Sequence, residues 1–500
     1  MYKISQIRRN LALFPPPLER FGTHMRRTKI VCTLGPASSN EKVIEKMLRA
    51  GMNVARLNFS HGTHEDHAKT IETFRAVRDR LDIPAAVMLD TKGPEIRIKT
   101  VKNGCITVNT GDTFILTSRE VEEGENEATI TYGRLVDIIT PGTKIVIDDG
   151  KIHLTVQETT NTDIICKVTD GGEIKNRKSI NIPNFCVDMP YLSDIDKSDI
   201  LFGIEQDVDF IAASFVRSKK DVIDLRKFID YNGGHSIKII AKIENMQGVD
   251  NFNEILANSD GIMIARGDMG VEVDFEKLPG IQKSFIKRCY QAGKIVITAT
   301  QMLESMVTNL MPTRAEISDV ANAVFDGTSA VMLSGETAMG VNPPHVVEVM
   351  AKIARQAETD AIRMGAYKGT IEFDDDEDTT NAICDAACTT AQDLKARAII
   401  AVTKSGYTAR RVSKFRPRQA IVASTPIKKT YHQLSMSWGV LPVLSLNQTD
   451  TDSLFQHAID CAKQVDVVKV GDRVVITAGV PLGRSGTTNI LKVETVEGSR

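Results

Sequence analysis

The chain has 500 residues, too many for one compact hydrophobic core, so two to four domains are expected. Its hydrophobic fraction of 42%, charged fraction of 25% and formal net charge of -2 are ordinary for a globular protein and give no indication of nucleic acid or a membrane as a partner. Eight scattered cysteines without a Cys-x-x-Cys pair favour reduced thiols in a cytoplasmic protein over disulfides or a zinc site.

Residues 1–24 differ from the rest of the chain. They contain a short apolar patch followed by three prolines, and the patch is too short for the core of a signal peptide. We expect a disordered extension, with an organelle transit peptide as the alternative. Met25 begins a strongly patterned segment and is a candidate for the natural start.

Eight short apolar runs recur along the chain, each of about strand length and bounded by polar or glycine-rich residues. They cover residues 29–34, 54–59, 85–89, 210–215, 237–243, 261–265, 294–299 and 330–333. Helical patterns separate most of the runs, and this alternation predicts a parallel sheet. Eight such units predict a TIM-type (β/α)8 barrel, assigned to residues 25–91 and 189–360.

The first helical pattern, residues 38–51, has recognisable end signals. Ser38 and Glu41 have the spacing of a capping box, and Gly51 is suited to close the helix.

Two segments interrupt the barrel pattern. Residues 92–188 are rich in short Val, Ile and Thr runs, with a predicted hairpin turn at Asp148-Asp149-Gly150, and we expect an inserted small β-barrel domain that acts as a lid. The acidic run 374–378 is predicted to be a solvated linker, because it lacks the ligand spacing of the alternative, a calcium loop.

Residues 361–500 form a predicted C-terminal α/β open-sheet domain. Its expected strands are residues 398–402, 420–423, 440–444, 473–477 and 490–496.

Polar and charged residues follow nearly all of the barrel runs, at the end where a barrel places its active site. Lys242 and Glu244 lie two residues apart on one predicted strand, so their side chains share a face. Glu244 and Asp268 follow neighbouring strands and could share a magnesium ion beside the Lys242 charge. The alternative is a structural Lys–Glu pair.

Three further patterns are weaker. The glycines of residues 267–270 allow backbone amides to approach an anion, although Gly-Asp turns are common. His61, His64 and His67 have helical spacing, but exposed loop histidines are favoured over a metal site. Residues 403–408 follow a predicted strand and are either a phosphate pocket or an ordinary capped turn.

Neither a Walker A loop nor the motifs of protein kinases occur. Instead, seven segments resemble the pyruvate kinase family in order and spacing, and the resemblance covers roughly residues 25–500. They are residues 57–62, 89–97, 239–245, 265–272, 299–306, 312–316 and 332–337. The resemblance implies transfer of a phosphoryl group from phosphoenolpyruvate to ADP, giving pyruvate and ATP, on a barrel with an inserted lid and a C-terminal effector domain.

The resemblance also implies roles for residues. The implied ligands of magnesium or manganese are Glu244 and Asp268. The implied ligands of potassium are Asn58, Ser60, Asp90 and the Thr91 carbonyl, and Glu95 matches the potassium-requiring branch. The residues implied to bind substrate are Arg56, Lys242, Gly267, Asp268 and Thr300, of which Arg56, Lys242 and Thr300 are also implied in catalysis. The residues implied near the nucleotide are Asn58, His61 and Arg97.

One position departs from the family. Ile195 stands where the family often has a lysine toward ATP, and Lys197 is shifted by two, so this contact is not carried over.

The C-terminal loop 480–489 resembles the family's effector loop, and the family implies a homotetramer. We expect a phosphorylated activator between this loop and residues 403–408. The residues of this expected effector site are Thr403, Lys404, Ser405, Gly406, Tyr407, Thr408, Arg484 and Gly486.

Two other functions are considered. A barrel lyase or aldolase acting on pyruvate-like enolates would use magnesium and two carboxylates, but it explains neither the inserted domain nor the potassium residues. A catalytically inactive metabolite sensor is disfavoured by the intact Lys242, Glu244, Asp268 and Thr300.

Overall fold

The computed structural model describes residues 25–121, 124–183, 185, 189–365, 378–448, 450–481 and 486–498. The chain forms two compact units, one of residues 30–351 and the other of residues from Lys352 onward with the described residues before Ile30. Among the described residues, no helix combines the length and the apolar composition needed to cross a membrane.

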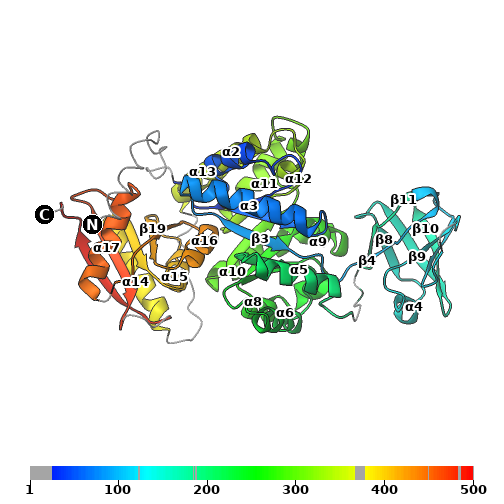
Figure 1. Ribbon diagram of the computed structural model, residues 1–500. Helices are drawn as coiled ribbons and strands as arrows, with labels where there is room; N and C mark the ends of the chain where they lie inside the picture. The colour runs from blue at the N-terminus through cyan, green and yellow to red at the C-terminus, as the bar shows by residue number, and fades with distance from the viewer. Residues whose placement is uncertain are drawn as a thin grey trace. The chain divides into compact units, whose positions relative to one another are not determined.

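Eight parallel strands close into a barrel in the order β1-β17-β16-β15-β14-β13-β3-β2, which confirms the predicted fold class (Figure 1). The strands are β1 (Lys29–Thr33), β2 (Val54–Asn58), β3 (Ala86–Asp90), β13 (Phe210–Ala213), β14 (Lys238–Ile243), β15 (Gly261–Ala265), β16 (Ile295–Ala299) and β17 (Ala330–Leu333). Nearly every strand residue is buried, as expected for short runs of Val, Ile and Ala covered on both faces.

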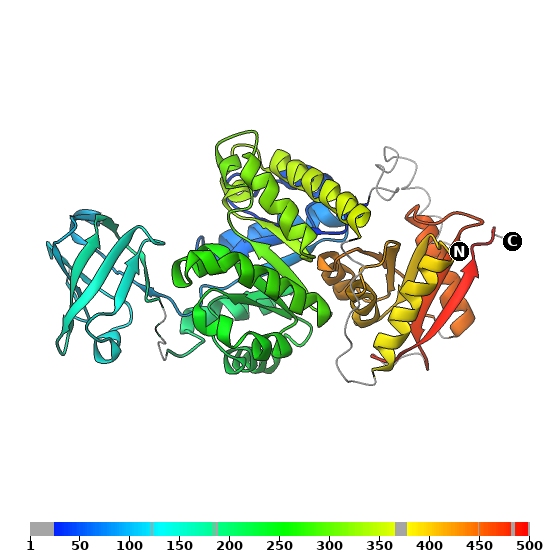
Figure 2. The same cartoon turned by 180° about the vertical axis from the view of Figure 1, so that it is seen from behind.

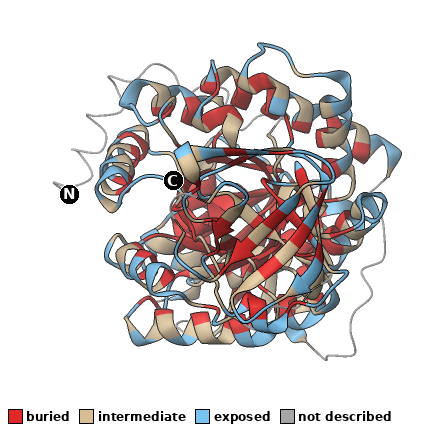
Figure 3. Ribbon diagram, turned by 90° about the vertical axis from the view of Figure 1, so that its right-hand side faces the viewer, coloured by how far each residue is buried: buried red, intermediate tan, exposed pale blue. Residues whose placement is uncertain are grey.

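Helices follow the barrel strands and surround them (Figure 1). The longer ones are α2 (Glu41–Ala50), α3 (His64–Leu81), α5 (Asp194–Glu205), α6 (Lys219–Tyr231), α10 (Leu278–Gln291), α11 (Arg314–Phe325) and α13 (Pro343–Met364). The shorter helices are α7 (Met246–Asp250), α8 (Phe252–Asn258), α9 (Arg266–Glu272) and α12 (Gly335–Ala338). Figure 3 shows buried residues in the strands at the centre and exposed residues on the outer sides of the helices.

Helix α2 begins with a different cap from the one predicted. Asn40 is the N-cap, and its side chain accepts a hydrogen bond from the Val43 amide at 3.0 Å. Ser38 instead accepts from the Gly35 amide at 3.1 Å, so the predicted Ser38–Glu41 capping box is wrong. Asn40 is the better placed acceptor because it directly precedes the helix. Gly51 closes the helix as predicted, with a φ of 120°.

The inserted segment forms a seven-stranded mixed sheet in the order β4-β12-β8-β9-β10-β6-β7 and a two-stranded sheet of β11 and β5. Its strands are β4 (Ile96–Arg97), β5 (Cys105–Val108), β6 (Thr113–Thr117), β7 (Glu127–Thr129), β8 (Lys144–Ile147), β9 (Ile152–Thr159), β10 (Asp163–Asp170), β11 (Gly172–Lys175) and β12 (Ser179–Asn181), with the short helix α4 (Leu135–Ile138). The predicted hairpin turn is confirmed, because β8 and β9 are antiparallel and Asp148, Asp149 and Gly150 all have positive φ.

The C-terminal unit contains an open five-stranded sheet in the order β20-β19-β18-β21-β22, parallel except for β22. Its elements are α14 (Thr379–Asp393), β18 (Ala398–Val402), α15 (Tyr407–Lys414), β19 (Ala420–Thr425), α16 (Lys428–Gln433), β20 (Val440–Leu444), α17 (Thr451–Gln464), β21 (Arg473–Gly479) and β22 (Thr488–Thr495). Successive residues of β18 face opposite sides of the sheet. Ala398 and Ile400 pack in the core that contains α17, and Ile399 and Ala401 pack in the core that contains α14 and α15.

Helix α14 lies along the sheet, beside β21 and β22 (Figure 2). The Asp378 side chain caps it by accepting from the Thr380 amide at 2.9 Å. The rest of the acidic run, residues 374–377, lies outside the described residues, as do residues 1–24.

Candidate functional site

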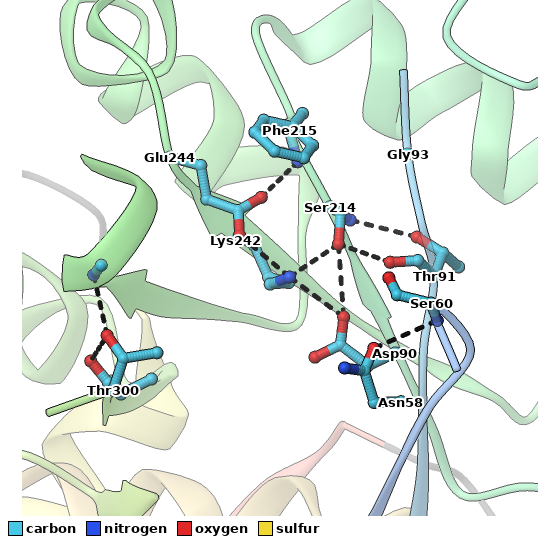
Figure 4. A network of polar contacts seen from close by, with 12 residues as sticks. Asn58, Ser60, Asp90, Thr91, Gly93, Ser214, Phe215, Lys242, Glu244 and Thr300 are labelled. Carbon is cyan, nitrogen blue, oxygen red and sulfur yellow. Dashed lines mark hydrogen bonds and ion pairs between the residues drawn. The ribbon is translucent and has the colours of Figure 1, made fainter. Parts of the chain in front are cut away.

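Lys242 is the centre of a buried polar network at the carboxyl ends of the barrel strands (Figure 4). Its Nζ lies 2.6 Å from Ser214 Oγ, 3.0 Å from Asp90 Oδ1 and 2.9 Å from Glu244 Oε1. Asp90 ends β3, Ser214 directly follows β13 and Glu244 directly follows β14, and these three strands are adjacent in the barrel. The period of two along β14 therefore brings Lys242 and Glu244 together as the sequence predicts.

Asp90 is shared between two cations. Arg56 Nε donates to Asp90 Oδ2 at 2.6 Å, and Arg56 also donates to Thr33 Oγ1 at 2.8 Å. The Asp90 side chain is 1% exposed. Burial opposes ionisation, but the charges of Arg56 and Lys242 hold the pKa of Asp90 below its usual value. For Lys242, burial favours the neutral form, yet Asp90 and Glu244 together raise its pKa above the usual value.

The two carboxylate oxygens of Glu244 have different partners. Its Oε2 accepts from the Phe215 amide at 2.6 Å, whereas Oε1 forms an ion pair with Lys242 Nζ at 2.9 Å and has no other partner among the described residues. Burial raises the pKa of Glu244 to about 8, with the Lys242 charge opposing the shift and Asp268 adding to it. A buried carboxylate oxygen whose one partner here is a lysine, with a second carboxylate nearby, fits a divalent cation.

Asn58, Ser60, Asp90 and Thr91 form a neighbouring group of oxygens at the ends of β2 and β3 (Figure 4). Asn58 and Asp90 are direct partners in the sheet, and Asn58 Oδ1 accepts from the Ser60 amide at 3.2 Å. The Thr91 carbonyl accepts from Ser214 Oγ at 2.6 Å. Side-chain and backbone oxygens of this kind fit a dehydrated monovalent cation.

Ser214 is a site residue to which the sequence prediction gave no role. Its hydroxyl donates to the Thr91 carbonyl and lies 3.2 Å from Asp90 Oδ1, so it joins the Lys242 network to the oxygens at the end of β3. Its position directly after the fourth barrel strand was the only sequence signal for it.

A cavity of about 730 Å³ opens over this network. It is lined by most of the predicted site residues, namely Arg56, Asn58, Ser60, His61, Arg97, Lys242, Glu244 and Asp268. Residues of the inserted segment, such as Lys178 and Asn181, also line it.

Two of the lining residues pair with neighbouring carboxylates. Asn181 Nδ2 donates to Glu272 at 3.0 Å, and burial raises the pKa of Glu272. Arg97 pairs with Glu95 at 2.6 Å.

Thr300 and Gly267, two further predicted site residues, are not part of this lining, although Gly267 directly precedes Asp268, and they contact each other. The Gly267 amide donates to Thr300 Oγ1 at 2.8 Å, and that hydroxyl donates to the Ala299 carbonyl at 2.6 Å. Arg266 fixes the same turn by donating to the Thr300 carbonyl at 2.7 Å. Thr300 has a φ of 66°, which is strained for a β-branched residue and of a kind that gathers at functional sites.

The histidine prediction was wrong in part. His64 and His67 belong to helix α3 and not to a loop, and His67 is buried, stacked on Phe59 with ring centroids 4.1 Å apart. His64 Nε2 lies 2.7 Å from Asp199 Oδ1. His61 alone remains exposed, at the cavity. The described residues contain no group of three or more His, Cys, Asp or Glu suited to a metal ion.

Ile195 is 56% exposed near the start of α5, and Lys197 pairs with Asp194 at 3.0 Å. Neither residue lines the cavity.

Residues 403–408 lead from β18 into α15 beside a second cavity, of about 80 Å³. Thr403 Oγ1 accepts from the Gly406 amide at 2.9 Å, as in a capped turn, and Gly406 has a φ of 79°. Thr403, Lys404, Ser405, Tyr407, Thr408 and Gly486 line this cavity. Arg484 lies outside the described residues.

Comparisons with known proteins agree with this architecture. The sequence model described as "Pyruvate kinase, barrel domain" matches residues 25–347, and the one described as "Pyruvate kinase, alpha/beta domain" matches residues 381–494. The chain is 47% identical over 476 residues to the pyruvate kinase of Staphylococcus haemolyticus, covering 94% of this chain and 81% of that protein. It is 45% identical over 474 residues to that of Clostridium acetobutylicum, covering 95% of this chain and 100% of that protein.

Proposed function

The chain belongs to the pyruvate kinase family of phosphotransferases, and from this premise we propose that it transfers the phosphoryl group of phosphoenolpyruvate to ADP, giving pyruvate and ATP. The observation that carries the proposal is Lys242, a buried cation held by Asp90, Ser214 and Glu244 at the floor of a cavity large enough for both substrates.

We assign Glu244 and Asp268 to magnesium or manganese, and the oxygens of Asn58, Ser60, Asp90 and Thr91 to potassium. Glu244 Oε1, whose one partner among the described residues is Lys242, and the grouped oxygens at the ends of β2 and β3 support this assignment. When bound, these cations supply positive charge that offsets the negative charge of the two substrates.

Lys242 and Arg56 supply the fixed positive charge of the chain itself. In the proposed reaction, they stabilise the charge that develops on the phosphoryl oxygens during transfer. After transfer, Lys242 stabilises the oxygen of the pyruvate enolate. Because Asp90 and Glu244 keep Lys242 protonated, its charge is present before the substrates arrive.

The turn of Gly267 and Thr300 is proposed to bind the carboxylate end of the substrate, and not its phosphoryl group. We place the substrate carboxylate against the backbone at Gly267 and Asp268, at the start of α9. Thr300 belongs to the apparatus that delivers a proton to the enolate carbon. His61 and Arg97, at the cavity wall, lie toward the nucleotide.

The inserted segment, residues 92–188, is proposed to act as a lid. Its residues line the cavity, and Asn181 holds Glu272 of the barrel. A closed lid excludes water, so the phosphoryl group reaches ADP and is not lost to hydrolysis.

A coupled assay of pyruvate formation tests the reaction. Turnover is expected with phosphoenolpyruvate, ADP, magnesium and potassium, and it should be lost when either ADP or magnesium is omitted. A carbon–carbon lyase would ignore ADP, and this result would overturn the proposal. Binding of Mn²⁺, followed by electron paramagnetic resonance, gives a readout separate from activity and should weaken in Glu244→Gln.

We also propose that a phosphorylated metabolite activates the enzyme at residues 403–408, together with Arg484 and Gly486. The hydroxyls of Thr403, Ser405 and Thr408 beside the small cavity support this proposal. Replacing these three residues by Ala should make turnover the same with and without the activator. Activation by sugar phosphates or AMP that survives the triple replacement would place the effector elsewhere.

We further propose a cytoplasmic homotetramer, as expected for the family. Light scattering should then give a mass of about 220 kDa, four times the chain mass of 55.0 kDa. A mass of one or two chains would contradict this.

A further inference from the structure

A second large cavity lies in the C-terminal unit, away from both sites described above. Its volume is about 530 Å³, and it opens where β18, β19 and β21 begin. Five cationic side chains line it, those of Arg27, Lys395, Arg397, Arg418 and Arg473. They come from four separate segments of the chain, so the fold and not a local charge run gathers them.

The five cations have no direct carboxylate partner among the residues that the structure describes. Within the described part of the chain, none of the five forms an ion pair with a carboxylate. Arg27 donates to the Arg418 carbonyl at 2.5 Å and Arg397 donates to the Val467 carbonyl at 3.1 Å, so neutral acceptors orient these two guanidinium groups. The one carboxylate in the lining, Asp472, already accepts from the Lys469 amide at 2.8 Å.

Backbone contacts hold the wall of the cavity in place. The Arg397 amide donates to the Arg473 carbonyl at 2.8 Å, which fixes the first residues of β18 and β21 side by side. On the other side, the Arg27 amide donates to both carboxylate oxygens of Glu358, at 3.0 and 2.9 Å. The cations are therefore mounted on ordered backbone, a preorganisation that favours binding.

This cavity is separate from the proposed effector loop. It lies at the amino ends of the parallel strands, whereas residues 403–408 follow the carboxyl end of β18. Five strand residues at about 3.3 Å each separate the two positions by about 16 Å. A ligand bound in this cavity therefore does not occupy the proposed effector site at residues 403–408.

We infer that this cavity binds a small polyanion that carries two or more phosphate groups. Arginine guanidinium groups match phosphate oxygens in pairs of hydrogen bonds, and four of the five cations are arginines. A volume of about 530 Å³ suits a small molecule more than the flat surface of a protein partner. This inference stands independently of the barrel chemistry.

Titration calorimetry of the full-length protein with tripolyphosphate, without divalent cations, tests the inference. The wild type should show a binding event that is weakened at least tenfold in Arg397→Ala/Arg473→Ala. Raising the salt from about 50 mM to about 300 mM should weaken the same event, because it depends on charge. Equal binding by wild type and double variant would overturn the inference.

The control is Lys352→Ala/Arg355→Ala, which removes two exposed cations of the same unit that do not line the cavity. It should bind tripolyphosphate like the wild type. A second cavity variant, Lys395→Ala/Arg418→Ala, also changes exposed positions. It should weaken tripolyphosphate binding as the first variant does, which would show that a folding defect in the first variant is not the cause. If a polyglutamate peptide, and not tripolyphosphate, binds in a manner that depends on Arg397 and Arg473, the phosphate class is wrong.

Discussion

Two buried cations, Arg56 and Lys242, share the single carboxylate of Asp90, whose side chain is 1% exposed. At this burial, water replaces a lost partner poorly, so each charge in the network depends on the others. The period of two along a strand is enough to predict that Lys242 and Glu244 lie together. The contacts of Ser214 could not be predicted, because they depend on how neighbouring strands are aligned.

Replacing Asp90 by Asn tests this dependence. The variant leaves two buried cations facing a neutral amide, and we expect a loss of about 3–5 kcal/mol in the free energy of unfolding. Asp260→Asn is the matched control, because Asp260 also bridges two cations, Arg226 and Lys238, but is 29% exposed. It should lose about 1 kcal/mol or less. Denaturant unfolding of both variants measures these losses. Equal losses in the free energy of unfolding would contradict the dependence of the buried charges on one another.

Lys29 gives a prediction about pH. It is buried, its Nζ donates to the Val440 carbonyl at 2.7 Å, and burial, aided by Arg26 and opposed by Glu358, lowers its pKa from 10.5 to about 7. At a pH between these two pKa values, Lys29 is protonated in a larger fraction of unfolded chains than of folded chains. Stability should therefore rise with pH in this window, by up to about 1.4 kcal/mol per unit, relative to Lys29→Met.

Urea unfolding of the wild type and Lys29→Met at pH 7, 8 and 9 measures this difference, and other titrating groups cancel in the comparison. A difference between the two proteins that stays constant with pH would show that Lys29 remains protonated in the folded state.

Among the structural elements, the turn after β3 is constrained by Gly93. Its φ is 75°, and a Cβ there would lie 2.8 Å from the Ser214 carbonyl oxygen and 2.9 Å from Ser214 Cβ. Any side chain at position 93 must therefore displace Ser214, which contacts both Lys242 and Asp90.

We expect Gly93→Ala to lower kcat about 10²-fold, because a small displacement of a positioned group costs that much. Gly111→Ala is the control, since Gly111 also has a positive φ, of 94°, but a Cβ there would meet nothing within 4 Å. It should cost about 1–2 kcal/mol of stability and leave kcat unchanged. Similar kcat values for the two variants would show that a side chain at position 93 does not disturb the site through Ser214.

The element predictions succeeded where burial decides and failed where local hydrogen bonds compete. Strands such as β15 and β17 have the predicted bounds because they are uniformly apolar runs between polar residues. The start of α2 was missed because Ser38, Asn40 and Glu41 all have side chains suited to a helix start, and only the backbone shows that Asn40 is the cap. His67 was predicted to be exposed, but a Phe59 ring covers it.

For the whole molecule, the alternation of strands and helices was enough to predict the barrel, and a change in pattern was enough to predict an insertion and a C-terminal sheet. The basic cavity could not be predicted, because Arg27, Lys395, Arg397, Arg418 and Arg473 come together only when three strands are aligned at their amino ends. The domain boundaries at residues 92, 189 and 361 remain predictions.

The central claim is that the buried charge of Lys242 drives phosphoryl transfer. Its most direct test is kcat for pyruvate formation from phosphoenolpyruvate and ADP in Lys242→Met, compared with Lys238→Met on the same strand, where Lys238 pairs with Asp260 away from the cavity. We predict a fall of about 10²–10³-fold or more for Lys242→Met and an unchanged kcat for Lys238→Met. A Lys242→Met enzyme with wild-type kcat would contradict the account.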